Sequence, residues 1–411
     1  MLKKIYEVFG FVVLIKQIFT FQIPFFSAPF LGRDINTYLL YILVVSSLTL
    51  WTTKTILNNK VSLRDLCLLI YMAISIIVTL IFSWTMNDVL SDAIMFMMPI
   101  VVYAWYSICK PSLNTYLNVI LIVSILSGVL SVLISLGIIN VNIWAAEGDL
   151  VRAAGAISST FGVGTFIITM CLLFLTDNSW SIKKRYLMYA SLIGSIVTVL
   201  LSFSRTRWVI CAFVFLLICL LSLKSANKTR FGFIRIASFI SILVIITIIY
   251  QPDIIDKAFA QMMIRFDNVQ ANDHSIAYRF EESSAQFAIF KSNFILGAGW
   301  GVLSYNDMYI HNLYASLPAQ SGVFSLCYFV WVFSFLTNII SRKHKFNAYI
   351  TISLIIQIVL IVLNVTNGGI VVSGGYFLLI YVFILDDTIR ENRLKKKGDI
   401  LQNENRHINL S

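Results

Sequence analysis

The chain has 411 residues, of which 58% are hydrophobic and only 12% are charged, and its formal net charge is +11. Soluble domains carry roughly 25% charged residues, so a soluble fold of this size is excluded by the shortage of charge. A mean hydropathy of +0.84 instead indicates a polytopic membrane protein. The basic residues form short clusters between apolar runs and no continuous basic face, so nucleic-acid binding is not expected.

Twelve apolar runs follow one another along the chain. Each predicts a membrane-spanning helix, because lipid cannot satisfy an open sheet edge. The predicted fold class is therefore all-α and polytopic, with about 12 transmembrane helices and one large, partly helical outer loop. The runs cover residues 8–27, 36–52, 66–84, 89–108, 114–138, 158–176, 186–203, 208–223, 233–250, 320–339, 349–364 and 369–385.

The positive charges orient these helices. With the N-terminus inside and the loops alternating, most lysines and arginines fall on the inner side, as the positive-inside rule requires. We therefore expect a multi-pass protein of the bacterial inner membrane, with both termini cytoplasmic and the large loop periplasmic. The outer segments carry only Arg33, Arg152, Arg205, Arg207, Lys257, Arg265, Arg279 and Lys291.

This pattern divides the chain into four parts. Residues 1–250 form transmembrane helices one to nine with short loops, and residues 251–320 form the large periplasmic loop with the candidate active site. Residues 321–385 form helices ten to twelve, and residues 386–411 form a basic cytoplasmic tail. The tail lacks apolar periodicity, so we expect it to lie disordered along the anionic inner leaflet.

Neither a metal nor a cofactor is expected. The six cysteines lie in or beside apolar runs and form no CxxC pair, and the chain has no DxD or HExxH motif. The glycines at 297, 299 and 301 alternate and do not form a dinucleotide fingerprint; a turn that brings backbone close to a neighbour accounts for them.

The outer arginines are candidate anion ligands. Arg205 and Arg207 lie in a tight turn between two spans, and Arg152 lies at the mouth of another. Arg279 opens an expected amphipathic helix that runs to about Lys291, with phenylalanines for its apolar face. A guanidinium suits phosphate oxygens. The alternative is that these side chains reach lipid headgroups or pair with nearby carboxylates.

His311 is the candidate for proton transfer. It lies between glycines and Tyr314, just before an apolar run, where an imidazole can meet a substrate held at the membrane. A lone histidine is more often structural than catalytic, and position alone does not decide between the two roles. The other three histidines lie in solvated or inner segments.

Together, these outer features resemble the family of bacterial O-antigen ligases and polymerases. In that family a His-Asn pair is followed by nine residues, a glycine, two residues, and then Gly, Thr or Tyr. Here His311-Asn312 is followed after nine residues by Gly322, and the last position is Ser325. The arginine turn at 205–207 and the segment 152–155 are also similar, and the resemblance covers roughly residues 150–340. A family arginine with a leucine four residues later is not reproduced.

The resemblance implies transfer of a glycan from an undecaprenyl-pyrophosphate donor to a glycan acceptor, with inversion and without metal. It implies that His311 is the base or the residue that orients the substrate, with Arg279, Arg205 and Arg207 on the pyrophosphate. It also implies that Arg152, Arg265, Asn312 and Tyr314 bind substrate, and that a chain-length regulator is a partner.

Three functions are weighed on this basis. The preferred one is an O-antigen polymerase, which extends one lipid-linked chain with another. A ligase would transfer the chain to lipid A-core instead, and the sequence barely separates the two. A transporter or flippase would predict ionisable residues along a path inside the spans, whereas Lys16 is almost the only such charge expected here.

Overall fold

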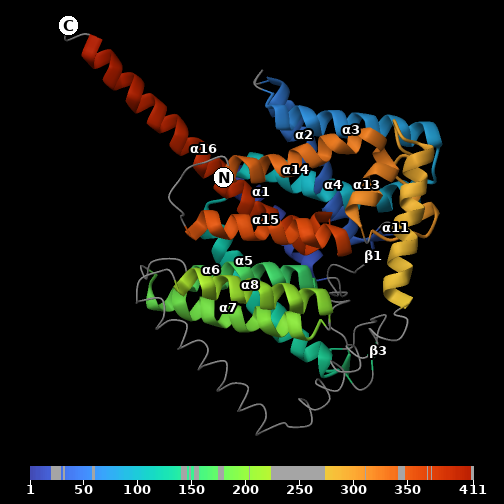
Figure 1. Cartoon of the computed structure of the whole chain (residues 1–411), viewed down its shortest axis with the longest axis horizontal. Coiled ribbons are helices and arrows are strands. Elements are labelled where there is room, and N and C mark those ends of the chain that lie inside the picture. Colours follow the sequence, from blue (N-terminus) through green and yellow to red (C-terminus); the bar gives the residue numbers. More distant parts are fainter. Residues whose placement is uncertain are drawn as a thin grey trace.

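The computed structural model of the chain describes residues 1–19, 29–30, 33–57, 61–139, 146–147, 150–151, 157–174, 180–202, 204–223, 274–310, 312–340, 348–367, 369–371 and 373–408. Within these ranges the fold is a bundle of long helices lying side by side (Figure 1). Its long helices are α1 (Leu2–Ile18), α2 (Ile35–Leu57), α3 (Leu63–Phe82), α4 (Met86–Cys109), α5 (Leu113–Ser135), α6 (Ser159–Phe174), α7 (Ile182–Leu200), α8 (Arg205–Leu223), α14 (Ser325–Ile340), α15 (Ala348–Asn367) and α16 (Ser373–Ile408).

Shorter elements lie between these helices. Two-residue strands form two antiparallel pairs, β1 (Pro29–Phe30) with β2 (Arg33–Asp34) and β3 (Ala146–Glu147) with β4 (Leu150–Val151). The remaining elements are the helices α11 (His274–Ser292), α12 (Val302–Tyr305) and α13 (Leu313–Ser321), and the 3-10 turns η2 (Gly322–Phe324) and η3 (Gly369–Val371).

The predicted class, an all-α polytopic membrane protein, is confirmed. A helix coincides with eleven of the twelve predicted runs, and the ninth run, 233–250, lies outside the described residues. In the part of the chain that is described, five helices are long and apolar enough to cross a membrane by length and composition. They are Ile35–Leu57, Leu63–Phe82, Met86–Cys109, Leu113–Ser135 and Leu313–Thr337.

The bundle has two distinct ends, which we name by what they carry. The terminal end carries the N-terminus and the projecting C-terminal part of α16 (Figure 1). At the opposite end, the α11 end, helix α11 lies across the bundle, and the strand pairs also lie there (Figure 1). This separation places α11, the first described element of the large polar loop, at the end opposite both termini.

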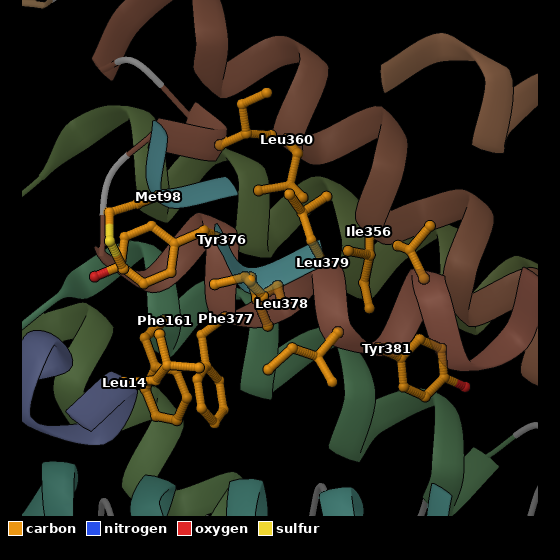
Figure 2. Packing of buried hydrophobic residues seen from close by; sticks show 14 of the residues in the cluster. Leu14, Met98, Phe161, Ile356, Leu360, Tyr376, Phe377, Leu378, Leu379 and Tyr381 are labelled. Carbon is orange, nitrogen blue, oxygen red and sulfur yellow. The ribbon is translucent and has the colours of Figure 1, made fainter. Parts of the chain in front are cut away.

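Helix α16 provides much of the centre of the bundle. Its aromatic and aliphatic side chains pack between α1, α4, α6 and α15, and Phe377 and Tyr381 are fully buried. Figure 2 shows this packing for Leu14, Met98, Phe161, Ile356, Leu360, Tyr376, Phe377, Leu378, Leu379 and Tyr381.

Small residues bring α5 and α7 into close contact. A Cβ on Gly128 would lie 2.4 Å from the Cα of Gly194, so neither position has room for a side chain. The buried hydroxyls of Ser124 and Ser195 lie 2.8 Å apart beside this contact. Small residues and interhelical hydroxyl pairs are the usual means of holding helices together in lipid, where burial of apolar surface gives no driving force.

The expectation of a disordered tail is wrong. Helix α16 continues without a break to Ile408. The segment after Asp386 contains no proline and is rich in Arg, Lys, Glu and Leu, which favour helix. A helix already formed inside the bundle extends into such a segment without a new nucleation step, and this explains why polar composition alone misled the prediction.

Candidate functional site

Helix α11 lies across the α11 end and carries Arg279. The sequence predicts a helix from about 277 to 291 within the large loop, and α11 confirms it. Its phenylalanines gather on one side, with the Phe287 and Phe290 ring centroids 5.8 Å apart, and this side is turned away from the bundle, since Phe280 and Phe287 are 74% and 47% exposed. The buried face holds the polar Glu282 and Gln286 instead, because α11 packs against polar backbone of the segment that leads into α13.

Glu282 and Gln286 each form a hydrogen bond with the backbone of Tyr309. A carboxylate oxygen of Glu282 accepts from the Tyr309 N–H at 3.0 Å. The Gln286 side-chain amide donates to the Tyr309 carbonyl at 3.0 Å and accepts from the Ser316 hydroxyl at 2.8 Å. Tyr309 is therefore tied to α11 two residues before His311, which itself lies outside the described residues.

The same helix holds a tyrosine hydroxyl near this carboxylate. A hydrogen bond to the ionised Glu282 raises the pKa of Tyr278, because a neighbouring negative charge disfavours the phenolate. Tyr278 is thus neutral at physiological pH and able to donate. The half-buried Arg279 is the next residue of α11.

Asn312 begins α13. Its side-chain oxygen accepts from the Tyr314 N–H at 3.0 Å, and its carbonyl accepts from the Ser316 N–H at 3.0 Å, as expected of a helix N-cap. The cap uses the side-chain oxygen, so the side-chain NH₂ is the part of Asn312 that can reach a substrate. Asn312 thus fixes where α13 starts, directly after His311.

Tyr314 lies against the bundle. Its ring stacks on Phe329 with the centroids 5.4 Å apart, and its hydroxyl donates to the Ile361 carbonyl in α15 at 3.3 Å. These contacts join α13 to α14 and α15. The structure therefore gives Tyr314 a packing role, whatever contact with substrate its half-buried ring makes.

The alternating glycines allow close approaches to backbone on two sides, because a Cβ on Gly299 would lie 2.8 Å from the Cα of Thr79 in α3 and Gly297 lies against Gln320 of α13. Gly297, Gly299 and Gly301 have φ of +75°, +82° and +110°. The N–H of Gly299 donates to the Gln320 carbonyl at 2.8 Å, and a Cβ on Gly297 would lie 2.3 Å from the carbonyl carbon of Gln320. The expected turn is confirmed, and it places this segment directly against α13.

Asp92 is a site residue that the sequence analysis missed. It is fully buried in α4, and one oxygen accepts from the Gly301 and Leu303 N–H groups at 2.9 and 3.0 Å. The other oxygen accepts from the Ser304 hydroxyl at 2.6 Å. Asp92 also corrects the expectation that Lys16 is almost alone as a charge within the spans; an acidic residue inside the run 89–108 was the available signal.

A further bond gives Asp92 its position at the centre of the α11 end. The Gln320 side-chain amide of α13 donates at 3.2 Å to Oδ2 of Asp92, the oxygen that also accepts from the Gly301 and Leu303 N–H groups. One carboxylate therefore fixes α12 and α13 on α4. The polar loop after α11 is thus seated on the bundle by specific hydrogen bonds.

Arg205 and Arg207 lie in the first turn of α8. The half-buried Arg207 donates to the Thr160 hydroxyl in the first turn of α6 at 3.4 Å. Neither α6 nor α8 has an acidic residue in its first turn. Two helix N-termini and a guanidinium therefore meet here, which favours an anion. The side chain of Arg205 and the residues Arg152 and Arg265 lie outside the described part of the chain.

The comparison with known families decides the identity of this region. A family model described as O-antigen ligase matches residues 189–330. This match covers about a third of the chain and supports membership of the O-antigen ligase and polymerase family. The matched region runs from α7 into α14 and contains Arg205, Arg207, Arg279 and His311. No curated protein matches the chain.

The family match confirms the resemblance inferred from the His-Asn spacing and the arginine turn. Arg152 precedes the matched region. The family and the apolar helices together support a multi-pass membrane protein of O-antigen biosynthesis.

Proposed function

We propose that this family member is an O-antigen polymerase, which joins undecaprenyl-pyrophosphate-linked repeat units at the outer face of the bacterial inner membrane. The family match supports an O-antigen ligase- or polymerase-type function. The observation that carries the proposal is the meeting of Arg207 with the N-termini of α6 and α8 at the end of the bundle opposite both termini. Such a site suits a pyrophosphate at a membrane boundary.

The proposed reaction is glycosyl transfer from a lipid-linked donor. The acceptor hydroxyl attacks the anomeric carbon of the donor, and the bond from that carbon to the pyrophosphate oxygen breaks. Negative charge grows on the undecaprenyl pyrophosphate, where Arg205, Arg207 and Arg279 stabilise it without a metal or cofactor. His311 takes the proton of the acceptor hydroxyl, and attack from the opposite side inverts the anomeric centre.

The remaining candidates serve the substrates. Asn312 starts α13 beside His311 and presents its side-chain NH₂ to the acceptor sugar, with Tyr314 two residues further along the chain. Arg152 and Arg265 add positive charge for the donor. Helix α11 holds the segment that leads to His311 through Tyr309, so the base and Arg279 depend on one support.

A ligase is the second candidate, because the matching family model is itself described as O-antigen ligase. The test supplies purified protein with lipid-linked repeat units, with and without lipid A-core. A polymerase produces a ladder of lipid-linked chains without lipid A-core, and EDTA does not stop it. Transfer only to lipid A-core would show a ligase, and no product under either condition would reject both functions.

A flippase is less well supported. Asp92, the buried acid found within a span, is held by backbone N–H groups and side chains of the loop, as a structural anchor would be. A transport path would instead need ionisable groups exposed to a water-filled route.

The membrane orientation has its own test. Single cysteines at Asn272, before α11, and at Asn403, near the end of α16, lie in the two segments that the proposal places on opposite sides. An impermeant maleimide should label the Asn272 position in cells with a permeabilised outer membrane, and should not label the Asn403 position. The reverse result would overturn the proposed periplasmic loop and cytoplasmic termini.

A further inference from the structure

The terminal end contains a cavity of about 420 Å³, on the side of the bundle opposite to α11. Its walls come from the last turns of α2 and α4, the first turn of α3, and the part of α16 around Asp386. This volume lies within the range of about 300–1,000 Å³ typical of small-ligand pockets. None of its lining residues falls in the family match at 189–330 or among the residues proposed for glycosyl transfer.

One wall of the cavity is a neutralised ion pair. Arg64 donates to Asp386 at 2.6 Å and to the Ser334 carbonyl at 2.9 Å, and its guanidinium lies 4.2 Å from the centre of the Phe335 ring. Both charged side chains are buried. Removing either one would leave a buried charge without its partner, so this pair forms rigid structure rather than a ligand group.

The other two carboxylates of the cavity are also engaged. Asp387 pairs with Lys110 at 3.0 Å and accepts from the Tyr106 hydroxyl at 3.2 Å. Asp65 accepts from the Tyr103 hydroxyl at 3.1 Å. These contacts fix the aromatic side chains that form the rest of the wall.

Two cations of the lining are left with no carboxylate partner. Lys54 donates at 2.7 Å to the Ser107 carbonyl, which is neutral. Among the described residues, no carboxylate lies within 4.0 Å of either Lys54 or Arg390. The charged groups that face Lys54 are Lys110, Lys3 and the Asp387 already paired with Lys110. The lining therefore has four cations for three carboxylates, and Lys54 and Arg390 are both exposed where the cavity opens.

We propose that this cavity binds a phosphate-bearing anion, which Lys54 of α2 and Arg390 of α16 contact. An ammonium and a guanidinium fork together suit a phosphate, and the aromatic wall suits the apolar part of a headgroup. The next turns of α16 add Arg393, Lys395, Lys396 and Lys397. A basic cluster of this kind beside a membrane attracts anionic lipid. The phosphate can come from such a lipid or from a soluble phosphate ester.

The test measures binding of fluorescent phosphatidylglycerol, with phosphatidylcholine as the neutral comparison, to the purified full-length protein in detergent. The variants are Lys54→Gln, Arg390→Gln and the pair together, all at exposed positions that the fold does not need. Each lost cation should weaken phosphatidylglycerol binding about fivefold, and the double variant about 25-fold. Lys183→Gln is the matched control, because Lys183 is an exposed cation in the first turn of α7 and does not line the cavity.

Competition with glycerol 1-phosphate identifies the source of the phosphate. Competition shows that the headgroup alone fills the site, whereas phosphatidylglycerol binding that glycerol 1-phosphate does not displace shows that the lipid is required; both results support the site. Equal binding by the parent and the double variant would overturn it. If Lys183→Gln weakened phosphatidylglycerol binding as much as Lys54→Gln or Arg390→Gln does, the proposal would also be overturned. Binding would then depend on surface charge in general and not on this cavity.

Discussion

A carboxylate oxygen of Glu282 lies 3.0 Å from the backbone nitrogen of Tyr309 and accepts its hydrogen bond. One turn further along α11, Gln286 donates to the carbonyl of the same residue. Two side chains of one helix thus bind both backbone polar groups of one residue, Tyr309, as a neighbouring strand would. The next residues in the chain are Ile310 and His311, so α11 sets the path of the His-Asn segment.

The first prediction concerns the hydrogen bonds that Gln286 forms with Tyr309 and Ser316. Gln286→Leu keeps the size of the side chain but removes both polar contacts, so the segment that leads into His311 gains freedom. A displacement of about 1 Å at a reacting group can cost on the order of 10²-fold in rate, and we expect a loss of that order in chain extension. The measurement is turnover of purified lipid-linked repeat units, together with thermal unfolding in detergent.

Ser284→Ala is the control for this variant. Ser284 is exposed on the same helix and should leave the rate unchanged. Parent-like turnover in Gln286→Leu would show that the Glu282 bond alone holds Tyr309 well enough. A large fall in the unfolding temperature would assign the loss to the fold.

The second prediction concerns Asp92. Asp92→Asn replaces one acceptor oxygen by an NH₂ group, which then faces backbone N–H or hydroxyl donors. A buried polar group left without a partner costs about 1–3 kcal/mol, so the free energy of unfolding should fall by at least that amount. The unfolding midpoint in detergent reports it. Asp88→Asn changes a half-buried carboxylate one turn earlier in α4, whose hydrogen bond comes from the hydroxyl of the exposed Thr85, and should have a smaller effect.

Equal midpoints for Asp92→Asn and Asp88→Asn would contradict this role for Asp92. If the role holds, turnover should fall in the Asp92 variant as well, because the same carboxylate seats α12 and α13. The unfolding midpoint and the turnover together distinguish two roles for Asp92. Substituting a structural anchor lowers both, whereas substituting a residue that only contacts substrate lowers turnover at unchanged stability.

The sequence predicts most of the fold, because each long apolar run must be a helix in lipid. It also predicts α11 and the close approach of the glycines, since both are local consequences of composition and backbone freedom. It does not predict Asp92 with Gly301, which lie 209 residues apart in the chain. Nor does it predict that α11 buries Glu282, because that depends on which groups the helix meets after folding.

The candidate residues divide in the same way. The arginine turn and the His-Asn pair are found from spacing and resemblance, and the family match includes both. The contact of Arg207 with Thr160 needs the packing of α8 on α6, which no local pattern encodes. For the same reason the capping role of Asn312 and the inward packing of Tyr314 emerge only in the folded chain.

The third prediction tests the arginines. Arg207→Ala should strongly reduce polymer formation while the protein remains in the membrane, because it removes a fixed positive charge from the pyrophosphate. Arg207→Lys should restore activity only partly, since an ammonium is a point charge without the guanidinium fork. Arg205→Ala should behave similarly. The measurement is the length distribution of lipid-linked product, with the amount of membrane protein determined in parallel.

Thr160→Val tests the hydrogen bond to Arg207 while leaving the positive charge of Arg207 in place. This variant keeps the shape of the side chain and removes the hydroxyl that Arg207 contacts at 3.4 Å. Its effect should be smaller than that of Arg207→Ala, because the guanidinium stays in place. Long product of normal length in both alanine variants would remove these arginines from the site.

The fourth prediction concerns His311, the proposed base. If it takes the proton of the acceptor hydroxyl, His311→Ala should lower turnover by about 10²–10⁴-fold, the range of general base catalysis. Binding of the lipid-linked donor should change little, because the arginines hold the pyrophosphate. The assay is extension of purified lipid-linked repeat units with EDTA present, beside a binding measurement with the donor alone.

His274→Ala is the control for this experiment, since His274 begins α11 outside the His-Asn motif and should leave turnover nearly intact. Gln286→Leu supplies a second comparison. If His311 is the base, the Gln286→Leu change should lower the rate only while His311 is present. The double variant Gln286→Leu with His311→Ala should then be no slower than His311→Ala alone. Extension at the parent rate by His311→Ala would make the ring structural, and Glu281 or Asp307 in the same loop would then be the carboxylates to test as base.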